Sequence, residues 1–381
     1  MVPVVVLAGL LVFAVVVLLY QGAAILFAVQ MPRLDPTPDP AGARRRPRLS
    51  VIIAARDEVD DLPACLEALR VQEYPDLEVI VVDGGSTDGT REAVRDRFGS
   101  VRLLEEPPLP EGWVGKNWAC DVGYRASSGE LLLFLDADVR LAPSALRVLV
   151  DWADAQRSDL TSLAPRVETV GFWERVILPF YTQMVLTYFR APRANRDTSR
   201  AAIANGQCWL TTRASYERAG GHAAVRGYIL EDIRIAQRYR AAGLRIRIAW
   251  APELAVTRMY RHRAEMFEGL LKNVHGTDFS ASRQVGFLAA LIGLFWLPLG
   301  VLPYGVAASS PVLIAVGGFL YLALFAKHAG FAGAIGTSWP YGLLFPLAVG
   351  FYVVLVTTSI SRGLRGERLT WKGRAYSSRP G

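Results

Sequence analysis

Cysteine is scarce in this chain. The three cysteines, Cys65, Cys120 and Cys208, are widely spaced and odd in number. A disulfide framework needs paired cysteines, and a structural zinc site needs closely spaced ones. The sequence therefore favours neither, and we expect Cys65 and Cys120 to lie in packed, reduced surroundings.

Lysine is also scarce. Only four of the 42 basic residues are lysines, and the others are arginines. A lysine in a chain that uses arginine almost everywhere else suggests a position where a compact point charge is needed. Lys116 lies in a glycine-rich loop and is expected to meet a diphosphate. Lys372, with Trp371 and Arg374, would reach the same phosphates or an acceptor headgroup from the tail. The alternative is that a lysine stands on a solvent-exposed face by chance and has no specific role, which fits Lys372 equally well.

Charge is absent from three long stretches: residues 2–30, 284–326 and 329–361, the last following Lys327 and His328. A membrane-spanning helix needs about 20 apolar residues. Residues 2–30 lack the basic start of a signal peptide and exceed its usual length, so we expect a retained anchor. The net charge of +7 lies largely beside these stretches, in a basic linker and a basic tail. We therefore expect an integral protein of a bacterial-type cell membrane with cytoplasmic basic flanks and catalytic domain, and no nucleic-acid partner.

Three full spans after a cytoplasmic domain would place the basic tail outside, against the positive-inside rule. We therefore expect one of the C-terminal apolar stretches to be re-entrant or interfacial. Residues 327–338, which are rich in glycine and contain a lysine, are the candidate.

Several nucleotide-binding motifs are missing. No G-x-G-x-x-G run follows the first expected strand, where Arg56, Asp57 and Glu58 stand instead, and there is no G-x-x-x-x-G-K-[ST] loop. Two acids at that place would repel a pyrophosphate. A hydride-transferring dinucleotide fold and a P-loop enzyme are therefore excluded.

What is present is an alternation of apolar strands and helices in which acids follow the strands. Residues 130–135, 49–55 and 77–82 read as buried strands. Ligands of open parallel sheets bind beyond the carboxyl ends of the strands. The expected site acids are Asp136 and Asp138 after the first of these strands, Asp57 and Glu58 after the second, and Asp83 after the third. The two acids of residues 136–138 could share one cation, or form an ordinary acidic turn.

After these strands in the chain, residues 201–211 read as a further strand, 220–222 as a mobile loop and 231–242 as a helix. Residues 171–189 are apolar and aromatic and are expected in the core or, preferably, on the bilayer surface. Residues 262–274 are expected to form a second interfacial helix, with Phe267, Leu270 and Leu271 toward lipid.

These features predict an α/β fold with an open, mostly parallel sheet between terminal membrane helices. The expected domains are an anchor (1–31), a linker (32–48), a catalytic domain (49–260), an interfacial region (261–283), membrane segments (284–361) and a basic tail (362–381).

The acidic motifs, in their order and spacing, resemble family 2 inverting glycosyltransferases with a GT-A fold. The matching residues are Asp83 in VVDGGSTD, Asp136 and Asp138, and the pair Glu231 and Asp232. Four further stretches resemble carotenoid-pathway diaponeurosporenoate glycosyltransferases: GWVGKNWAC at 112–120, GGH at 220–222, RMY at 258–260 and WKGRAY at 371–376. Ceramide glucosyltransferases and hopanoid-associated glycosyltransferases are similar in layout.

The resemblance implies a role for each matching position. Asp83 would hold a uridine, helped by Asp57 and Glu58, while Asp136 and Asp138 would hold ribose and a divalent metal, Mg²⁺ or Mn²⁺. Asp232 beside Glu231 would be the general base, an assignment that matches the ceramide-type pattern; the alternative is a helix N-terminus stabilised by its dipole. The remaining expected contacts to acceptor or diphosphate are Trp209, His222, Arg261, Trp371, Lys372 and Arg374.

The expected reaction is metal-dependent transfer of a hexose from a nucleotide sugar to a membrane lipid. The Q-x-x-R-W motif of processive synthases is missing, since the only Gln-x-x-Arg after Asp232 begins at Gln237 inside the expected helix and is followed by Ala241. Two alternatives stay open: a glycosyltransferase acting on a polyprenyl phosphate or an oligosaccharide of the cell envelope, and a non-catalytic membrane scaffold.

Overall fold

The computed structural model describes residues 3–36, 46–276, 280–365, 367, 369–371 and 374–376. The chain divides into two compact units, which are described separately. The sheet unit contains Met31–Glu168, Phe189–Met259 and Leu369–Gly381. The helical unit contains Met1–Gln30, Thr169–Tyr188 and Tyr260–Arg368. Residues 171–188 therefore belong to the helical unit, although they lie inside the expected catalytic segment.

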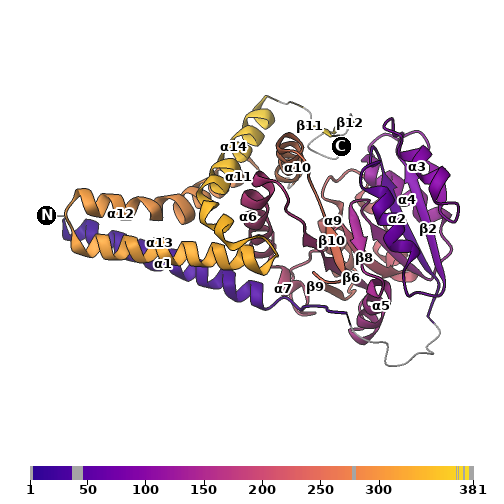
Figure 1. Cartoon of the computed structure of the whole chain (residues 1–381), viewed down its shortest axis with the longest axis horizontal. Coiled ribbons are helices and arrows are strands. Elements are labelled where there is room, and N and C mark those ends of the chain that lie inside the picture. The colour runs from indigo at the N-terminus through magenta and orange to yellow at the C-terminus, as the bar shows by residue number, and fades with distance from the viewer. Residues whose placement is uncertain are drawn as a thin grey trace. The chain divides into compact units, whose positions relative to one another are not determined.

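The sheet unit is built around a mostly parallel sheet (Figure 1). In its described part the sheet has seven strands in the order β3-β2-β1-β4-β8-β6-β9, and only β8 is antiparallel to its neighbours. The strands are β1 (Leu49–Ala55), β2 (Leu77–Asp83), β3 (Arg102–Glu105), β4 (Leu131–Leu135), β6 (Leu160–Ala164), β8 (Cys208–Thr212) and β9 (Ile246–Trp250). Their apolar runs suit a sheet covered on both faces. The predicted fold class is confirmed.

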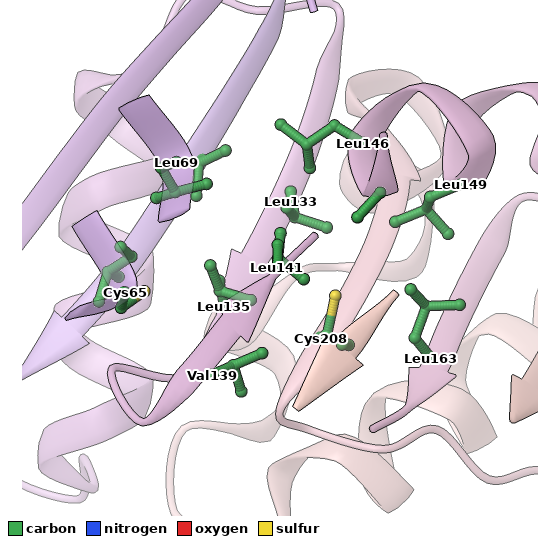
Figure 2. Packing of buried hydrophobic residues seen from close by; sticks show 14 of the residues in the cluster. Cys65, Leu69, Leu133, Leu135, Val139, Leu141, Leu146, Leu149, Leu163 and Cys208 are labelled. Atoms are coloured by element: carbon green, nitrogen blue, oxygen red, sulfur yellow. The ribbon is translucent and has the colours of Figure 1, made fainter. Parts of the chain in front are cut away.

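Helices cover both faces of this sheet. One face carries α2 (Leu62–Arg70), α3 (Thr90–Arg97) and α5 (Ala145–Ala155). The other face carries α4 (Gly115–Ala126), α8 (Arg213–Ala219) and α9 (Glu231–Ala241). Figure 2 shows the first core, where Cys65 and Leu69 of α2, Leu133 and Leu135 of β4, and Cys208 of β8 gather. Cys65, Cys120 and Cys208 are buried free thiols, as expected for Cys65 and Cys120.

The strand register aligns the ends that carry the predicted site. In the β1 and β2 pair, Ala55 lies beside Asp83, and in the β1 and β4 pair Ile52 lies beside Phe134. The residues after β1, β2 and β4 therefore leave the sheet at the same edge. This edge carries the acidic segments that the sequence singled out.

A smaller sheet lies within the same unit, with the order β5-β10-β7 in the described residues. Its strands are β5 (Val139–Leu141), β7 (Arg166–Val167) and β10 (Ala255–Thr257). Thr257 of β10 lies opposite Val139, one residue after Asp138. The unit also contains α7 (Ala191–Ala194), η1 (His222–Val225) and a hairpin of β11 (Leu369–Trp371) and β12 (Arg374–Tyr376).

Two local predictions differ from the structure. The strand expected at 201–211 begins only at Cys208, because Asn205, Gly206 and Gln207 form a turn with side-chain hydrogen bonds. Of the mobile loop expected at 220–222, Gly220 and Gly221 do form a turn after α8, but His222 begins η1 and is only 1% exposed. In both places side-chain contacts, which periodicity does not encode, decide the local conformation.

The helical unit contains four helical segments, among the described residues, that are long and apolar enough to cross a bilayer: Val4–Leu26, Ser282–Ala307, Pro311–Ala334 and Trp339–Leu364. These segments mark the chain as a membrane protein. The elements are α1 (Val4–Val29), α6 (Phe172–Tyr188), α10 (Arg263–His275), α11 (Ala281–Leu291), the π-helical η2 (Ile292–Trp296), α12 (Leu297–Ala307), α13 (Pro311–Ala334), η3 (Trp339–Leu344) and α14 (Phe345–Leu364).

Residues 327–334 continue α13 as a regular helix, and the chain turns at Gly336 with φ of 86°. The re-entrant course expected for residues 327–338 stays a prediction. Packing within this unit corrects another expectation. Leu270 and Leu271, expected to face lipid, are 1% and 0% exposed because α10 packs against α14. Phe267 meets Phe351 of α14 with 5.7 Å between the ring centroids.

Candidate active site

Lys116, at the start of α4, joins two of the predicted site acids. Its Nζ lies 2.7 Å from Asp136 Oδ1 and 3.0 Å from Glu231 Oε1. Asp136 follows β4 and Glu231 opens α9, so three elements meet at one ammonium group. Burial lowers the pKa of Lys116, but the two carboxylates outweigh it and raise the pKa well above its usual value. The lysine is therefore a fixed positive charge at the sheet edge.

Asp232 lies next to Glu231 in the first turn of α9. Its Oδ2 accepts a hydrogen bond from Gly206 N at 2.9 Å, and its Oδ1 accepts one from Ile233 N at 2.7 Å. Burial, followed by the charge of Glu231, raises the pKa of Asp232 to about 7, although Lys116 and the two hydrogen bonds act in the opposite direction. A carboxylate with such a pKa can take up a proton at neutral pH.

Asp138 lies two residues beyond Asp136 and is held by β10. Its Oδ2 accepts a hydrogen bond of 2.8 Å from Thr257 Oγ1, and Thr257 in turn accepts one of 3.2 Å from Gln207 Nε2. Burial, then the charge of Asp136, raises the pKa of Asp138 to about 6. Two carboxyl groups that repel each other in this way would be stabilised by a shared cation.

The donor set fits a hard divalent cation whose shell is completed by other ligands. Within the described ranges no group of three or more His, Cys, Asp or Glu side chains could hold a metal by itself. Asp136 and Asp138 offer carboxylate oxygens only, and Mg²⁺ or a similar ion is commonly held by one or two carboxylates plus substrate phosphates. These two residues therefore suit an ion that arrives with a phosphorylated ligand.

Asp83, at the end of β2, is fully buried and bound from several sides. Its Oδ2 lies 2.7 Å from Arg91 Nη2, and its carboxylate accepts backbone hydrogen bonds from Gly85 and Ser86. Burial raises the pKa of Asp83, but the hydrogen bonds from Ser86 and Arg91 outweigh it and hold the pKa below its usual value. Asp83 is therefore ionised and rigidly placed.

Asp57 and Glu58 connect the loops after β1 and β2. Asp57, at a left-handed φ of 51°, accepts a hydrogen bond from Thr87 N, and its own N–H donates to Ser86 Oγ. The N–H of Glu58 donates to Thr90 Oγ1. These hydrogen bonds link the loop after β1 to the loop after β2, so Asp57 helps to hold the loop that follows Asp83.

Trp209 and His222 lie in an aromatic cluster under the sheet edge, 2% and 1% exposed. Trp209 stacks on Phe134 with centroids 4.3 Å apart, and His222 Nδ1 lies 2.8 Å from Tyr216 Oη. Burial, and to a smaller extent Lys116, lowers the pKa of His222 to about 3, so the ring is neutral. Trp209 is therefore not presented to an acceptor in this structure, and His222 brings no positive charge to a diphosphate.

The other expected acceptor contacts stay predictions. Arg261 belongs to the helical unit, where its backbone N–H donates to Glu265. Trp371 and Arg374 pair across the β11 and β12 hairpin, and Lys372 lies outside the described residues.

Sequence reasoning missed three residues that hold the site together. Gly206 contacts Asp232 through its N–H, and a Cβ there would lie 3.1 Å from Asp232 Oδ2. The backbone carbonyl of Gln207 accepts the N–H of Asp136 at 2.9 Å, and Thr257 anchors Asp138. The only available signal was the turn-forming residues Asn205 and Gly206 inside an expected strand.

The mostly parallel sheet, with acids at its carboxyl edge, has the layout expected of a GT-A fold. Residues 50–220 match the family described as Glycosyl transferase family 2, and this match together with the relatives identifies the chain as a glycosyltransferase.

Relatives agree with this class. The chain is 25% identical over 340 residues to the 4,4'-diaponeurosporenoate glycosyltransferase of Staphylococcus aureus, covering 86% of this chain and 88% of that protein. It is 26% identical over 229 residues to the enzyme of the same name from Staphylococcus haemolyticus, covering 59% and 60%. Among solved structures, a mannosyltransferase from Pyrobaculum calidifontis in complex with GDP-Man and Mn²⁺ is similar in fold, with a TM-score of 0.53, 20% identity and coverage of 93% and 97%.

Proposed function

We propose that this protein is a metal-dependent, inverting glycosyltransferase that moves a hexose from a nucleotide sugar, most simply a UDP-sugar, to a membrane lipid. The observation that carries the proposal is the meeting of Lys116, Asp136 and Glu231 beside Asp232. The names of the relatives support a lipid of the carotenoid type, and the Mn²⁺ and GDP-Man in the archaeal mannosyltransferase support a metal and a nucleotide sugar.

The donor would lie along the carboxyl edge of the sheet. Asp83, ionised and rigid, would accept hydrogen bonds from the base, and Asp57 and Glu58 would border the same pocket. Asp136 and Asp138 would hold a Mg²⁺ or Mn²⁺ ion, which supplies charge stabilisation for the departing diphosphate. Lys116 would add a second positive charge to the same diphosphate.

Asp232 would act as the general base. Its carboxylate would take the proton of the acceptor hydroxyl as that oxygen bonds to the anomeric carbon and the bond to the diphosphate breaks. A single displacement of this kind inverts the anomeric centre. The pKa of about 7 suits this task, because the group is available as a base at neutral pH and strong enough to accept a proton.

The apolar helices support a lipid acceptor, and the basic residues that flank them support a cytoplasmic catalytic domain. In this proposal the catalytic domain is residues 49–260, between the anchor (1–31) and the C-terminal membrane segments (284–361).

The test compares lipid extracts by mass spectrometry after membranes carrying wild type or Asp232→Asn are given a panel of nucleotide sugars. A lipid heavier by one hexose only with wild type is the expected result. Asp197→Asn is the matched control, because Asp197 pairs with Arg247 at the surface. A hexose found on a polyprenyl phosphate would contradict the proposed acceptor. The absence of product with every donor would contradict the proposed reaction.

A further inference from the structure

Asn117, the residue after Lys116 in α4, connects that helix to the segment that leads into α9. Its side chain is buried, and the residue is 0% exposed. Its Nδ2 donates to three backbone carbonyls, those of Val225 at 3.0 Å, Arg226 at 3.1 Å and Tyr228 at 3.0 Å. These carbonyls lie 108 to 111 positions further along the chain. One amide group therefore joins two distant parts of the sheet unit.

The contacts of Asn117 assign the orientation of its amide. Backbone carbonyls only accept hydrogen bonds, so the NH₂ group faces them and the amide oxygen points away. This oxygen, Asn117 Oδ1, is buried and has no hydrogen-bond partner among the described residues. A buried polar atom without a partner costs about 1–3 kcal/mol, which reduces the net stabilisation from the three hydrogen bonds. Their main result is therefore the placement of the segment they hold.

Further contacts hold the same segment to both helices. Val114 N, just before α4, donates to Arg226 O at 2.7 Å. The guanidinium of Arg234, in the first turn of α9, lies over Tyr228, 4.6 Å from the ring centroid. Residues 225–228 therefore form a fixed connection between the start of α4 and the start of α9.

Two neighbouring residues of α4 thus hold the start of α9. Lys116 Nζ lies 3.0 Å from Glu231 Oε1, and Asn117 holds the backbone just before that residue. Asp232 follows Glu231 directly, so its place at the sheet edge depends on both contacts. The proposed metal-binding acids are fixed by other elements, since they follow β4 and Thr257 of β10 holds one of them.

We propose that Asn117 is a positioning residue that sets the place of the Asp232 carboxylate relative to the bound donor sugar. It acts through the backbone of residues 225–228 and does not touch the substrate. A misplacement of about 1 Å can lower a rate about 100-fold, so this connection matters for turnover and not for donor binding. The inference rests on the proposed function, because it takes Asp232 as the base.

The test measures turnover and donor affinity separately, in the full-length protein in nanodiscs. Asn117→Leu replaces the amide by an apolar side chain of similar size, and Asn117→Asp keeps its shape without the amide N–H donors. In both variants kcat should fall about 10- to 100-fold. Calorimetry with Mn²⁺ and the nucleotide sugar that supports wild-type transfer should give wild-type affinity. Wild-type kcat in either variant would overturn the proposal. So would an equal loss of kcat and affinity, because Asn117 would then only support the fold.

Hydrogen–deuterium exchange reads the connection without turnover. Backbone amides of residues 225–234 should exchange faster in Asn117→Leu, whereas those of β1 and β2 should be unchanged. Asn195→Leu is the matched control, because the Asn195 amide bonds the backbone of Ile248 in the edge strand β9 through both its nitrogen and its oxygen. It should keep wild-type kcat.

The two readouts separate this inference from the proposed function. Absence of hexose transfer by the wild type would contradict the proposed function. Unchanged exchange of residues 225–234 in Asn117→Leu would overturn the role of Asn117, whatever reaction the protein catalyses.

Discussion

Thr257 Oγ1 donates a hydrogen bond of 2.8 Å to Asp138 Oδ2, although the two residues are 119 positions apart. Thr257 ends β10 and Asp138 precedes β5, so the small three-stranded sheet makes this contact. Partners that orient a metal-binding carboxylate affect metal affinity nearly as strongly as the carboxylate itself. The contact makes Thr257 a positioning residue for the proposed metal site.

Thr257→Val should weaken Mn²⁺ binding by roughly ten-fold, because Asp138 loses the hydrogen bond that orients it. Electron paramagnetic resonance of free Mn²⁺ measures this without turnover. Thr161→Val is the matched control, since the buried Thr161 hydroxyl has no partner in the described residues and its loss should leave Mn²⁺ binding unaltered. Equal Mn²⁺ affinities in wild type and Thr257→Val would contradict the role of Thr257.

Lys116→Met should weaken nucleotide-sugar binding by about ten-fold or more, because the diphosphate loses a positive charge and Asp136 and Glu231 lose their shared partner. Lys116→Arg should recover only part of this, since a planar guanidinium does not replace a point charge between two carboxylates. Calorimetry with a nucleotide sugar and Mn²⁺ gives the affinities. Lys272→Met, on α10 of the helical unit, serves as the control, and wild-type affinity in Lys116→Met would refute the proposed contact.

The rate should rise with pH through about 7 and then level off, because Asp232 must be ionised to act as a base. In Lys116→Met the midpoint should move to higher pH, since the lysine is one of the groups that lower the pKa of Asp232. The measurement is the pH profile of kcat for both proteins. A wild-type profile that is flat between about pH 5 and 8, where a carboxyl of such a pKa titrates, would exclude Asp232 as the base.

The same carboxyl group should make stability depend on pH. An unfolded aspartate titrates near pH 4, whereas folded Asp232 titrates near 7, so between these values the folded protein binds more protons. Stability should therefore fall as the pH rises through this window. Asp232→Asn removes the titration, and thermal unfolding of the two proteins should diverge in favour of the variant as the pH rises. Parallel curves would contradict the raised pKa.

Gly221→Ala should destabilise the sheet unit by about 3 kcal/mol or more, because strain at a positive φ adds to a clash. The φ of Gly221 is 54°, and a Cβ would lie 2.5 Å from Tyr216, the partner of His222. Gly243→Ala isolates the strain: its φ is 74° with nothing within 4 Å of the added Cβ, so it should cost about 1–2 kcal/mol. Chemical denaturation of both variants gives the difference, and equal losses would remove the clash from the explanation.

Much of the fold could be read from local pattern. The runs that became β1, β2 and β4 are mostly apolar and end at charged residues. The helix α1 is long and charge-free, and α13 is long and apolar with Lys327 as its one charged residue. Hydrophobic period and composition were therefore sufficient to predict these elements. Asp83, Asp136 and Asp138 could be proposed because carboxylates after parallel strands follow from chain order, whereas Asp232 was proposed from the resemblance to known glycosyltransferases. The strand expected at 201–211 starts only at Cys208, and His222 of the loop expected at 220–222 is buried, because side-chain hydrogen bonds decide the local structure at both places.

By itself, then, the sequence determined which groups are candidates for the chemistry, because residue type and position along strands are local properties. Only the tertiary structure decided which groups meet: Lys116 with Asp136 and Glu231, Gly206 with Asp232, and Thr257 with Asp138. It also decided that Trp209 and His222 are buried in an aromatic core. The physical reason is that pairing across a sheet, burial and the resulting pKa shifts depend on residues far apart in the chain, which no local pattern specifies.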